Sequence, residues 1–216
     1  MMHTHIFFDL GFTLIDESFA VQARVERTAE RLRGTPQACS LEEFTAMMRR
    51  AARENAHPYA SVMERLGVAW REPFPKELER PYPGAKPLLE SLRGRFRLGV
   101  IANQSEGTQR RLREWGLAHY FDVIVSSAEE GLEKPDPRIF HLALERAGCA
   151  PEQAIMVGDR LDNDIVPAKR LGMKTIWIRQ GWGGVPEPKS VEETPDIQVC
   201  DLEKLRKILN PPLTEL

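Results

Sequence analysis

The sequence is poor in cysteine and nearly balanced in charge, and each of these shortages excludes a class of protein. Its three cysteines are odd in number and far apart in a chain of 216 residues: Cys39, Cys149 and Cys200. They fit neither a disulfide framework nor the close spacing of a cysteine metal site, so we expect buried, reduced thiols. A formal net charge of −2 gives no reason to expect nucleic acid or an anionic membrane as a partner.

Long apolar runs are also missing. The longest have the length of a strand, far below the roughly 20 residues that span a bilayer. The first residues lead directly into an apolar segment over 6–8, without the charged and then apolar pattern of a signal peptide. Together with the reduced cysteines, these features predict a cytoplasmic protein. A chain of this length holds one good core, or a core and a small second domain.

From about residue 82 onward, short β-branched runs alternate with amphipathic stretches. Strands are predicted over 98–102, 122–126, 154–157 and 175–178, and helices near 106–116, 137–147 and 162–171. Asp136 is predicted to cap the second of these helices, with Pro137 at its first position. Such an alternation builds right-handed βαβ units, so we predict an α/β fold with a parallel sheet covered on both faces.

The stretch from 16 to 80 breaks this alternation. It contains no convincing strand and is rich in Arg, Glu and Ala. Ser40 and Glu43 form a capping-box pattern at the start of one helix. Two further helices are predicted, near residues 18–33 and 58–67. We therefore predict a small helical module inserted after the first strand. A loop over 183–196 and a last helix over 201–209 complete the prediction.

Two of the apolar segments end in carboxylates. Asp9 follows the first segment, and Asp159 follows a later one, with Asp164 five residues further on. Because the carboxyl ends of parallel strands meet at one edge of a sheet, these side chains can gather around one hard cation and leave room for a phosphate. The alternative is structural, with Asp9 as a turn residue and the later carboxylates as caps of the following helix.

Four landmarks resemble the haloacid dehalogenase-like hydrolase superfamily in order and spacing. They are Asp9 to Thr13, Tyr82-Pro-Gly84, Lys134-Pro-Asp136 and the segment from Gly158 to Asp164. The resemblance covers nearly the whole chain. It implies a Rossmann-like parallel sheet core with a small all-helical cap domain, Mg²⁺ as cofactor and a small phosphorylated molecule as substrate. The implied domains are a core of residues 1–15 and 81–216 and a cap of residues 16–80.

The resemblance also implies roles for single residues. Asp9 is the expected nucleophile, which forms an aspartyl phosphate. Lys134 is expected to neutralise Asp9 and to bind the phosphoryl oxygens. The implied metal ligands are the carboxylates of Asp9, Asp159 and Asp164 and the backbone carbonyl of Gly11. Asn163 is expected to orient a ligand, and Thr13 to brace the loop after the nucleophile.

Three positions depart from the family pattern. Gly11 stands where the family's phosphatases carry a second aspartate, an acid–base group of a kind that contributes about 10²–10⁴-fold to the rate. Phe12 adds bulk where the family usually has glycine. Ala102 lacks the hydroxyl that usually binds the phosphoryl group. We therefore expect the backbone N–H groups of Asn103 and Gln104 to bind the anion instead. Ser105 is predicted as an N-cap.

Three functions remain open at this point. The first is a magnesium-dependent phosphatase or phosphoryl-transfer hydrolase, weakened or specialised by the changes at Gly11 and Ala102. The second is carbon–halogen or carbon–phosphorus cleavage. It is disfavoured because the metal-binding carboxylates are retained and Lys76, the only lysine between residues 17 and 80, lies at the exit of the inserted segment. The third is a catalytically silent protein that binds metal and a phosphorylated ligand. The substrate and the oligomeric state are left open.

Overall fold

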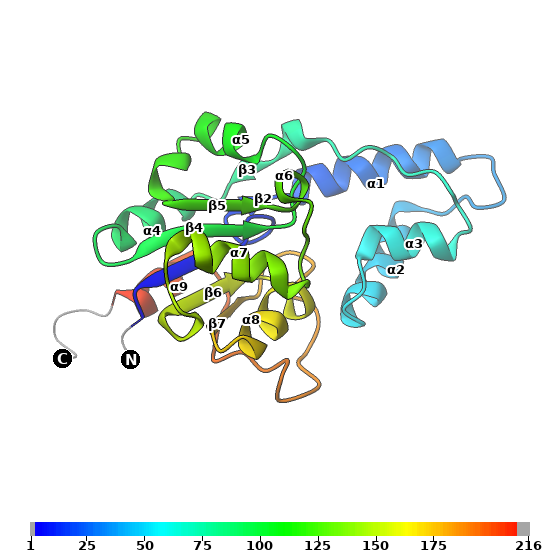
Figure 1. Ribbon diagram of the computed structural model, residues 1–216. Coiled ribbons are helices and arrows are strands. Elements are labelled where there is room, and N and C mark those ends of the chain that lie inside the picture. The colour runs from blue at the N-terminus through cyan, green and yellow to red at the C-terminus, as the bar shows by residue number, and fades with distance from the viewer. Residues whose placement is uncertain (1–2, 211–216) are drawn as a thin grey trace.

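A six-stranded parallel sheet forms the centre of the computed structural model, which describes residues 3–210 (Figure 1). Its strands run in the order β5-β4-β1-β6-β7-β8. They are β1 (His5–Phe8), β4 (Arg97–Ala102), β5 (Val123–Ser126), β6 (Ala154–Gly158), β7 (Lys174–Ile178) and β8 (Ile197–Val199). All pairings are parallel, which confirms the predicted α/β fold. The first two and last six residues of the predicted core domain lie outside the described residues.

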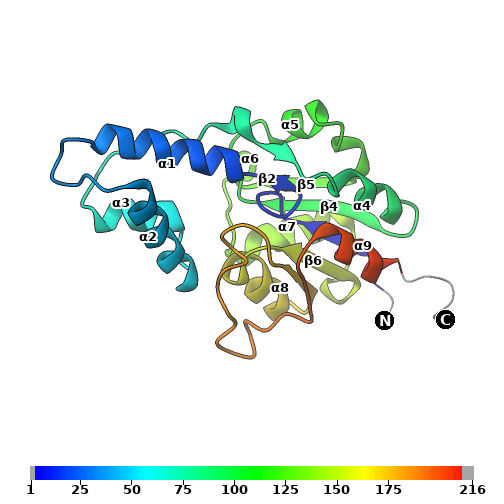
Figure 2. The same ribbon diagram turned by 180° about the vertical axis from the view of Figure 1, so that it is seen from behind.

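Side chains along each strand alternate between the two faces of the sheet, and apolar side chains point to both faces. Helices therefore cover both faces. Ile6 and Phe8 of β1 belong to one buried cluster, and Phe7 between them belongs to another. The first face is covered by α4 (Ala85–Leu92), α5 (Thr108–Glu114) and α9 (Leu202–Leu209). The second is covered by α7 (Pro137–Ala147) and α8 (Val166–Arg170). Figures 1 and 2 show the two layers from opposite sides. Because helices pack on both faces, the carboxyl ends of the strands are held in place along one edge of the sheet.

The inserted segment (residues 16–80) carries three helices that lie to one side of the sheet (Figures 1 and 2). They are α1 (Ser18–Leu32), α2 (Leu41–Arg53) and α3 (Pro58–Arg65). The predicted capping box is present in α2, since Glu43 N–H donates to Ser40 Oγ at 3.1 Å and Ser40 N–H donates to Glu43 Oε2 at 2.8 Å. The helices enclose a hydrophobic cluster of their own, including Phe44, Met48 and Met63. The segment thus has a core separate from that of the sheet.

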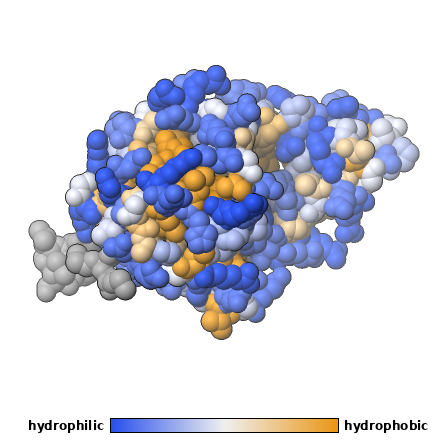
Figure 3. All heavy atoms as spheres, viewed as in Figure 1, coloured by the Kyte–Doolittle hydropathy of each residue, from blue (hydrophilic) through white to orange (hydrophobic). Residues whose placement is uncertain are grey.

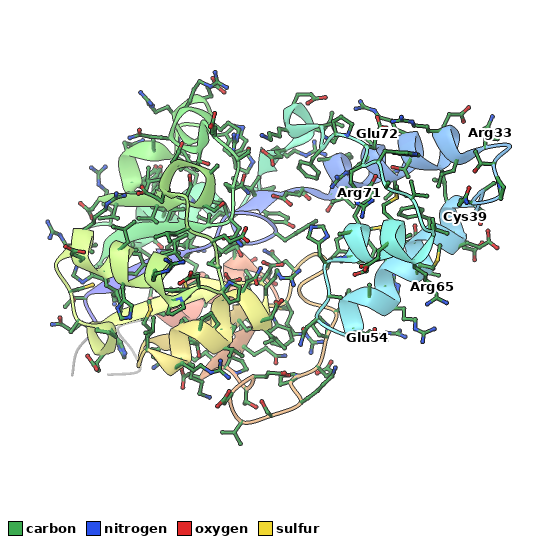
Figure 4. All side chains as sticks on the ribbon, turned by 45° about the vertical axis from the view of Figure 1, so that its right-hand side comes forward. Arg33, Cys39, Glu54, Arg65, Arg71 and Glu72 are labelled. Carbon is green, nitrogen blue, oxygen red and sulfur yellow. The ribbon has the colours of Figure 1, made fainter. Side chains whose placement is uncertain are left out.

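The chain returns from α3 along α1. Arg71 and Glu72 lie in this returning stretch (Figure 4). Glu72 pairs with Arg31 of α1 at 3.6 Å, and its carbonyl oxygen accepts a hydrogen bond from Arg24 Nε at 2.7 Å. The two ends of the segment then meet in a short antiparallel pair, β2 (Ile15–Asp16) and β3 (Arg80–Pro81). This pair joins the helices to the sheet.

Several local predictions are wrong. The strands β2, β3 and β8 were not expected, because two or three residues are too few to show a strand pattern. Ser105 caps no helix: α5 begins after Gly107, whose left-handed φ of 82° suits glycine, and Ser105 Oγ is buried without a hydrogen-bond partner among the described residues. All three cysteines are free, but Cys39 and Cys149 are only half-buried and Cys200 is exposed.

The remaining elements are short. They are α6 (Ser127–Glu130), the 3₁₀ turns Lys76–Leu78, Ala118–Tyr120 and Pro151–Gln153, and a π-helical turn at Leu161–Ile165. No helix within residues 3–210 is both long and apolar enough to cross a membrane. On the side seen in Figure 3, hydrophobic residues gather over the sheet region, whereas hydrophilic residues cover most of the inserted helices.

Candidate active site

Three buried carboxylates meet at the carboxyl ends of β1 and β6. Asp9 directly follows β1, Asp159 directly follows β6, and Asp164 lies in the π-helical turn after it. One ligand atom of each lies within 4.8 Å of those of the other two. Their exposed fractions are 8%, 4% and 1%. The structure therefore brings together the three side chains that the sequence predicts as metal ligands.

Lys134 lies between two of these carboxylates. Its Nζ donates to Asp9 Oδ1 at 2.6 Å, to Asp164 Oδ1 at 2.5 Å and to the carbonyl oxygen of Ile101 at 2.9 Å. Asn103 fixes the backbone of Lys134 from the neighbouring strand end, because its amide accepts from Lys134 N–H at 2.7 Å and donates to the carbonyl oxygen of Lys134 at 2.8 Å. The predicted lysine thus reaches the predicted nucleophile across 125 residues of sequence.

The cluster carries more negative than positive charge. Three carboxylates and one ammonium group leave two formal negative charges in a buried space. Burial, followed by the neighbouring carboxylates, raises the pKa of Asp159 well above its ordinary value. Burial also raises the pKa of Asp164 to about 6, although the contact with Lys134 opposes this rise. A divalent cation with oxygen ligands, such as Mg²⁺, would balance the excess charge, so these residues fit a metal of that kind.

Neighbouring side chains hold the carboxylate of Asp9 and the backbone of Asp159 in place. Thr13 Oγ1 donates to Asp9 Oδ2 at 3.3 Å, and Trp177 Nε1 donates to the carbonyl oxygen of Asp159 at 2.6 Å. Two glycines leave the space that the carboxylates occupy. A Cβ atom on Gly158 would lie 2.3 Å from the Asp164 carboxyl, and one on Gly183 would lie 2.1 Å from Asp159 Oδ2. The site therefore depends on close packing from the loop after β7 as well as on the strand ends.

Gly11 lies in the loop after Asp9, and the carboxyl group of Glu17 lies directly beside Gly11. A Cβ atom on Gly11 would be 2.5 Å from Glu17 Oε1. Burial, together with the nearby charges of Glu79 and Asp9, raises the pKa of Glu17 to about 8. The sequence gives no signal for Glu17, since it is one acid among many and precedes a helix without capping it. Only the fold places its carboxyl at the site.

Gln104, which was predicted to bind an anion through its backbone N–H, makes several hydrogen bonds within the protein. Its backbone N–H donates to Ser127 Oγ at 3.0 Å and is engaged within the protein. Its side chain donates to Glu17 Oε1 at 3.4 Å and accepts from Arg111 Nη2 at 2.9 Å. Asn103 is likewise tied to Lys134 through its side chain. Of the predicted phosphoryl-binding residues, Lys134 is the one whose charged group reaches Asp9. The side chains of Asn103 and Gln104 contact Lys134 and Glu17, and anion binding by the backbone N–H of Asn103 stays a prediction.

A cavity of about 620 Å³ opens from the carboxylates toward the inserted helices. The insert contributes Arg24, Tyr59 and Lys76 to its lining, and the core contributes Arg160 and Asn163. The guanidinium of Arg24 lies 3.7 Å from the centre of the Tyr59 ring. Arg160 also links the two parts, because its Nη2 donates to the carbonyl oxygen of Asn55 at 3.1 Å. Cations and an aromatic ring in a cavity that Asp9 also lines suit a small anionic organic molecule.

Glu17→Gln is expected to make folding stability less dependent on pH in the metal-free protein. The pKa of Glu17 is higher in the folded state, so wild type loses stability as pH rises from the ordinary value of 4.5 through about 8. The variant should gain on the order of 2 kcal/mol over wild type across this window, because one pKa unit corresponds to about 1.4 kcal/mol and partial exposure screens some of it. Urea unfolding in EDTA measures this gain. Glu77→Gln, at an exposed position, is the control. Parallel pH profiles of wild type and Glu17→Gln would contradict the prediction.

Comparison with known proteins agrees with this geometry. The family model described as haloacid dehalogenase-like hydrolase matches residues 6–178. The chain therefore belongs to the haloacid dehalogenase-like hydrolase family, as the sequence landmarks predicted.

Individual relatives differ in how much they share with the chain. A glyceraldehyde 3-phosphate phosphatase of Methanopyrus kandleri is 42% identical over 122 residues, which are 56% of this chain and 52% of that protein. The chain thus matches about half the length of this relative. A phosphoglycolate phosphatase of Aquifex aeolicus is 30% identical over 229 aligned positions, covering 97% of this chain and 98% of that protein. Among solved structures, the putative HAD-hydrolase YfnB from Bacillus subtilis, bound to magnesium, has a TM-score of 0.71 at 23% identity, covering 97% of this chain and 100% of that one.

Proposed function

We propose that the protein is a magnesium-dependent phosphatase that acts on a small phosphorylated metabolite through a phosphoaspartate on Asp9. The observation that carries this proposal is the contact between Asp9 and Lys134 at 2.6 Å, inside a cluster of three buried carboxylates. The names of two relatives, a glyceraldehyde 3-phosphate phosphatase and a phosphoglycolate phosphatase, support the choice of reaction.

In this proposal, an Asp9 carboxylate oxygen attacks phosphorus and the leaving group departs with the electron pair of the broken bond. Lys134 holds Asp9 in place and offers its positive charge to the phosphoryl oxygens. The carboxylates of Asp9, Asp159 and Asp164, with the backbone carbonyl of Gly11, would hold Mg²⁺. When bound, the ion supplies positive charge that lets a phosphate approach these carboxylates. The magnesium in the structure of the Bacillus subtilis relative supports the choice of metal.

We also propose that residues 16–80 act as a cap that covers the bound substrate. Lining residues from both parts of the molecule surround one cavity, so the insert is suited to select the organic group of the substrate. Arg24 and Lys76 bring positive charge to the lining of the cavity that Asp9 also lines. Movement of such a cap would exclude water during the reaction and release the product afterwards.

A panel of phosphorylated metabolites, assayed with and without magnesium, tests the proposal. Wild type should release phosphate from at least one substrate only when magnesium is present. Asp9→Asn should release none, because the amide cannot form the phosphoenzyme. Turnover that survives in Asp9→Asn would contradict the assignment of the nucleophile.

A second function is supported by the absence of a side chain at Gly11 and of a hydroxyl at Ala102. In that case the protein binds Mg²⁺ and a phosphorylated ligand without hydrolysing it. The same panel separates the two functions: ligand binding measured by calorimetry, with no phosphate released from any substrate, would favour the silent protein.

A further inference from the structure

We propose that the carboxyl group of Glu17 serves as the general acid and base of the reaction, in place of the side chain that Gly11 lacks. This inference rests on the proposed phosphatase function. It assigns the proton transfers to a residue outside the family's sequence pattern, six positions further along the chain.

The first support is the space that Glu17 occupies. A Cβ atom built on Gly11 would lie 2.5 Å from Oε1, 2.9 Å from the carboxyl carbon and 3.2 Å from Oε2 of Glu17. The whole carboxyl group therefore stands where a side chain at position 11 would begin. Asp9 and Glu17 line the same cavity. A proton carried by Glu17 is thus offered from the direction in which an aspartate at position 11 would offer it.

The second support is the way the backbone brings Glu17 back to Gly11. The N–H groups of Thr13, Leu14 and Ile15 all donate to the carbonyl oxygen of Leu10, at 3.1, 2.9 and 2.9 Å. This tight loop returns the chain to the site within a few residues. Glu17 then lies between β2 and α1, at the base of the inserted segment.

The third support is a chain of contacts that orients the carboxyl group. Gln104 Nε2 donates to Glu17 Oε1 at 3.4 Å, and Arg111 holds Gln104 by donating to its Oε1 at 2.9 Å. Arg111 is itself buried and pairs with Glu79 at 3.6 Å. A solvent-exposed side chain without a functional role would not need these hydrogen bonds to fix its position. The contacts leave Oε2 of Glu17 without a protein hydrogen-bond partner among the described residues.

Other acids that line the cavity are engaged elsewhere. Glu79 pairs with Arg111, and Asp162 pairs with Arg160 at 2.6 Å. Asp159 and Asp164 belong to the cluster suited to a metal. Among the carboxyl groups of the described residues that line the cavity, Glu17 is the one that lies against Gly11.

The proton transfers balance over two steps. In the first, Asp9 attacks phosphorus, the bond from phosphorus to the ester oxygen breaks, and that oxygen takes the proton of Glu17 to leave as an alcohol. In the second, the Glu17 carboxylate takes a proton from water as the water oxygen attacks phosphorus. The bond to Asp9 breaks with its electron pair returning to the Asp9 carboxylate. Ester and water become alcohol and phosphate, and Glu17 regains its proton.

The test compares leaving groups in Glu17→Gln, using alkyl and aryl phosphates that wild type hydrolyses. Without an acid, the leaving oxygen must depart as an anion, so kcat for alkyl phosphates should fall by about 10²–10⁴-fold. Aryl phosphates should keep a fast first step. They should show a burst of phenol followed by slow turnover, because no base activates water against the phosphoenzyme. Glu77→Gln replaces an exposed acid of the same segment and should behave as wild type.

Two further variants relocate the acid. Gly11→Asp alone should gain little, because the Glu17 carboxyl already occupies the space beside position 11. The double variant Gly11→Asp, Glu17→Ala should recover turnover of alkyl phosphates relative to Glu17→Ala. This rescue separates a chemical role from a purely structural one.

The possible failures are distinguishable. If Asp9→Asn is inactive while Glu17→Gln hydrolyses alkyl phosphates at the wild-type rate, the role of Glu17 is wrong and the phosphatase function stands. If wild type and Asp9→Asn are equally inactive on every substrate, the phosphatase function and the role of Glu17 both fail. Uniform loss on alkyl and aryl substrates in Glu17→Gln, with no burst and no rescue by the double variant, would also overturn the role of Glu17.

Discussion

Lys134→Met is expected to destabilise the metal-free protein by about 3–5 kcal/mol near neutral pH, because it leaves buried carboxylates without their counter-charge. Lys134 is 3% exposed and pairs with Asp9 and Asp164. Burial opposes its charge, but the carboxylates of Asp164 and Asp9 outweigh this effect and raise the pKa of Lys134. Methionine is of similar length and removes the charge with little change in packing. Urea unfolding in EDTA measures the loss.

An exposed lysine provides the control for this prediction. Lys86→Met removes a surface ion pair with Glu90, at 3.9 Å, and should change the free energy of unfolding by no more than about 0.5 kcal/mol. A double-mutant cycle then isolates the buried pair. Asp9→Asn should offset part of the loss in Lys134→Met, because it removes one of the carboxylates left unpaired. A loss below about 1 kcal/mol in Lys134→Met would mean that the cluster is already protonated or solvated.

The parts of the site that follow from regular structure could be predicted from the sequence. Asp9 and Asp159 follow buried strands directly, so the parallel sheet alone brings them to one edge. Lys134 is different. A single lysine before a proline carries no signal in its own neighbourhood, and its role was expected only from the resemblance to the family. Its contact with Asp9 depends on Asn103, which fixes its backbone from another strand end.

The parts that depend on loop geometry could not be predicted. Glu17 reaches Gly11 only because a tight loop turns the chain back after Leu10, and no sequence pattern states how sharply a loop turns. The backbone N–H of Gln104 was expected to be free to bind an anion, but it donates a hydrogen bond to Ser127 Oγ. The contact of Arg24 with Tyr59 joins α1 and α3 and depends on how the inserted helices pack. In each case the missing information is tertiary.

Magnesium is expected to stabilise the folded wild-type protein. Millimolar Mg²⁺ should raise the melting temperature of wild type, because a ligand that binds only the folded state stabilises it, by about 2.7 kcal/mol at 100 times its Kd. Asp159→Asn should abolish most of this gain. The same variant should be more stable than wild type in EDTA, since burial and the neighbouring carboxylates make the charge of Asp159 unfavourable in the metal-free state. Thermal unfolding with and without Mg²⁺ measures both effects.

Asp162→Asn is the matched control for Asp159→Asn. It makes the same chemical change three residues away, but Asp162 pairs with Arg160 at 2.6 Å and lies outside the cluster of three carboxylates. This variant should keep the magnesium-dependent gain. If Asp159 is a ligand, the two variants must differ in magnesium affinity measured by calorimetry, whatever their stability in EDTA. Equal affinity in wild type and Asp159→Asn would refute the proposed site. If both variants lost the same magnesium affinity, the cause would be a general effect of negative charge at the cavity. Loss of a direct ligand would instead weaken magnesium binding in Asp159→Asn and leave Asp162→Asn unchanged.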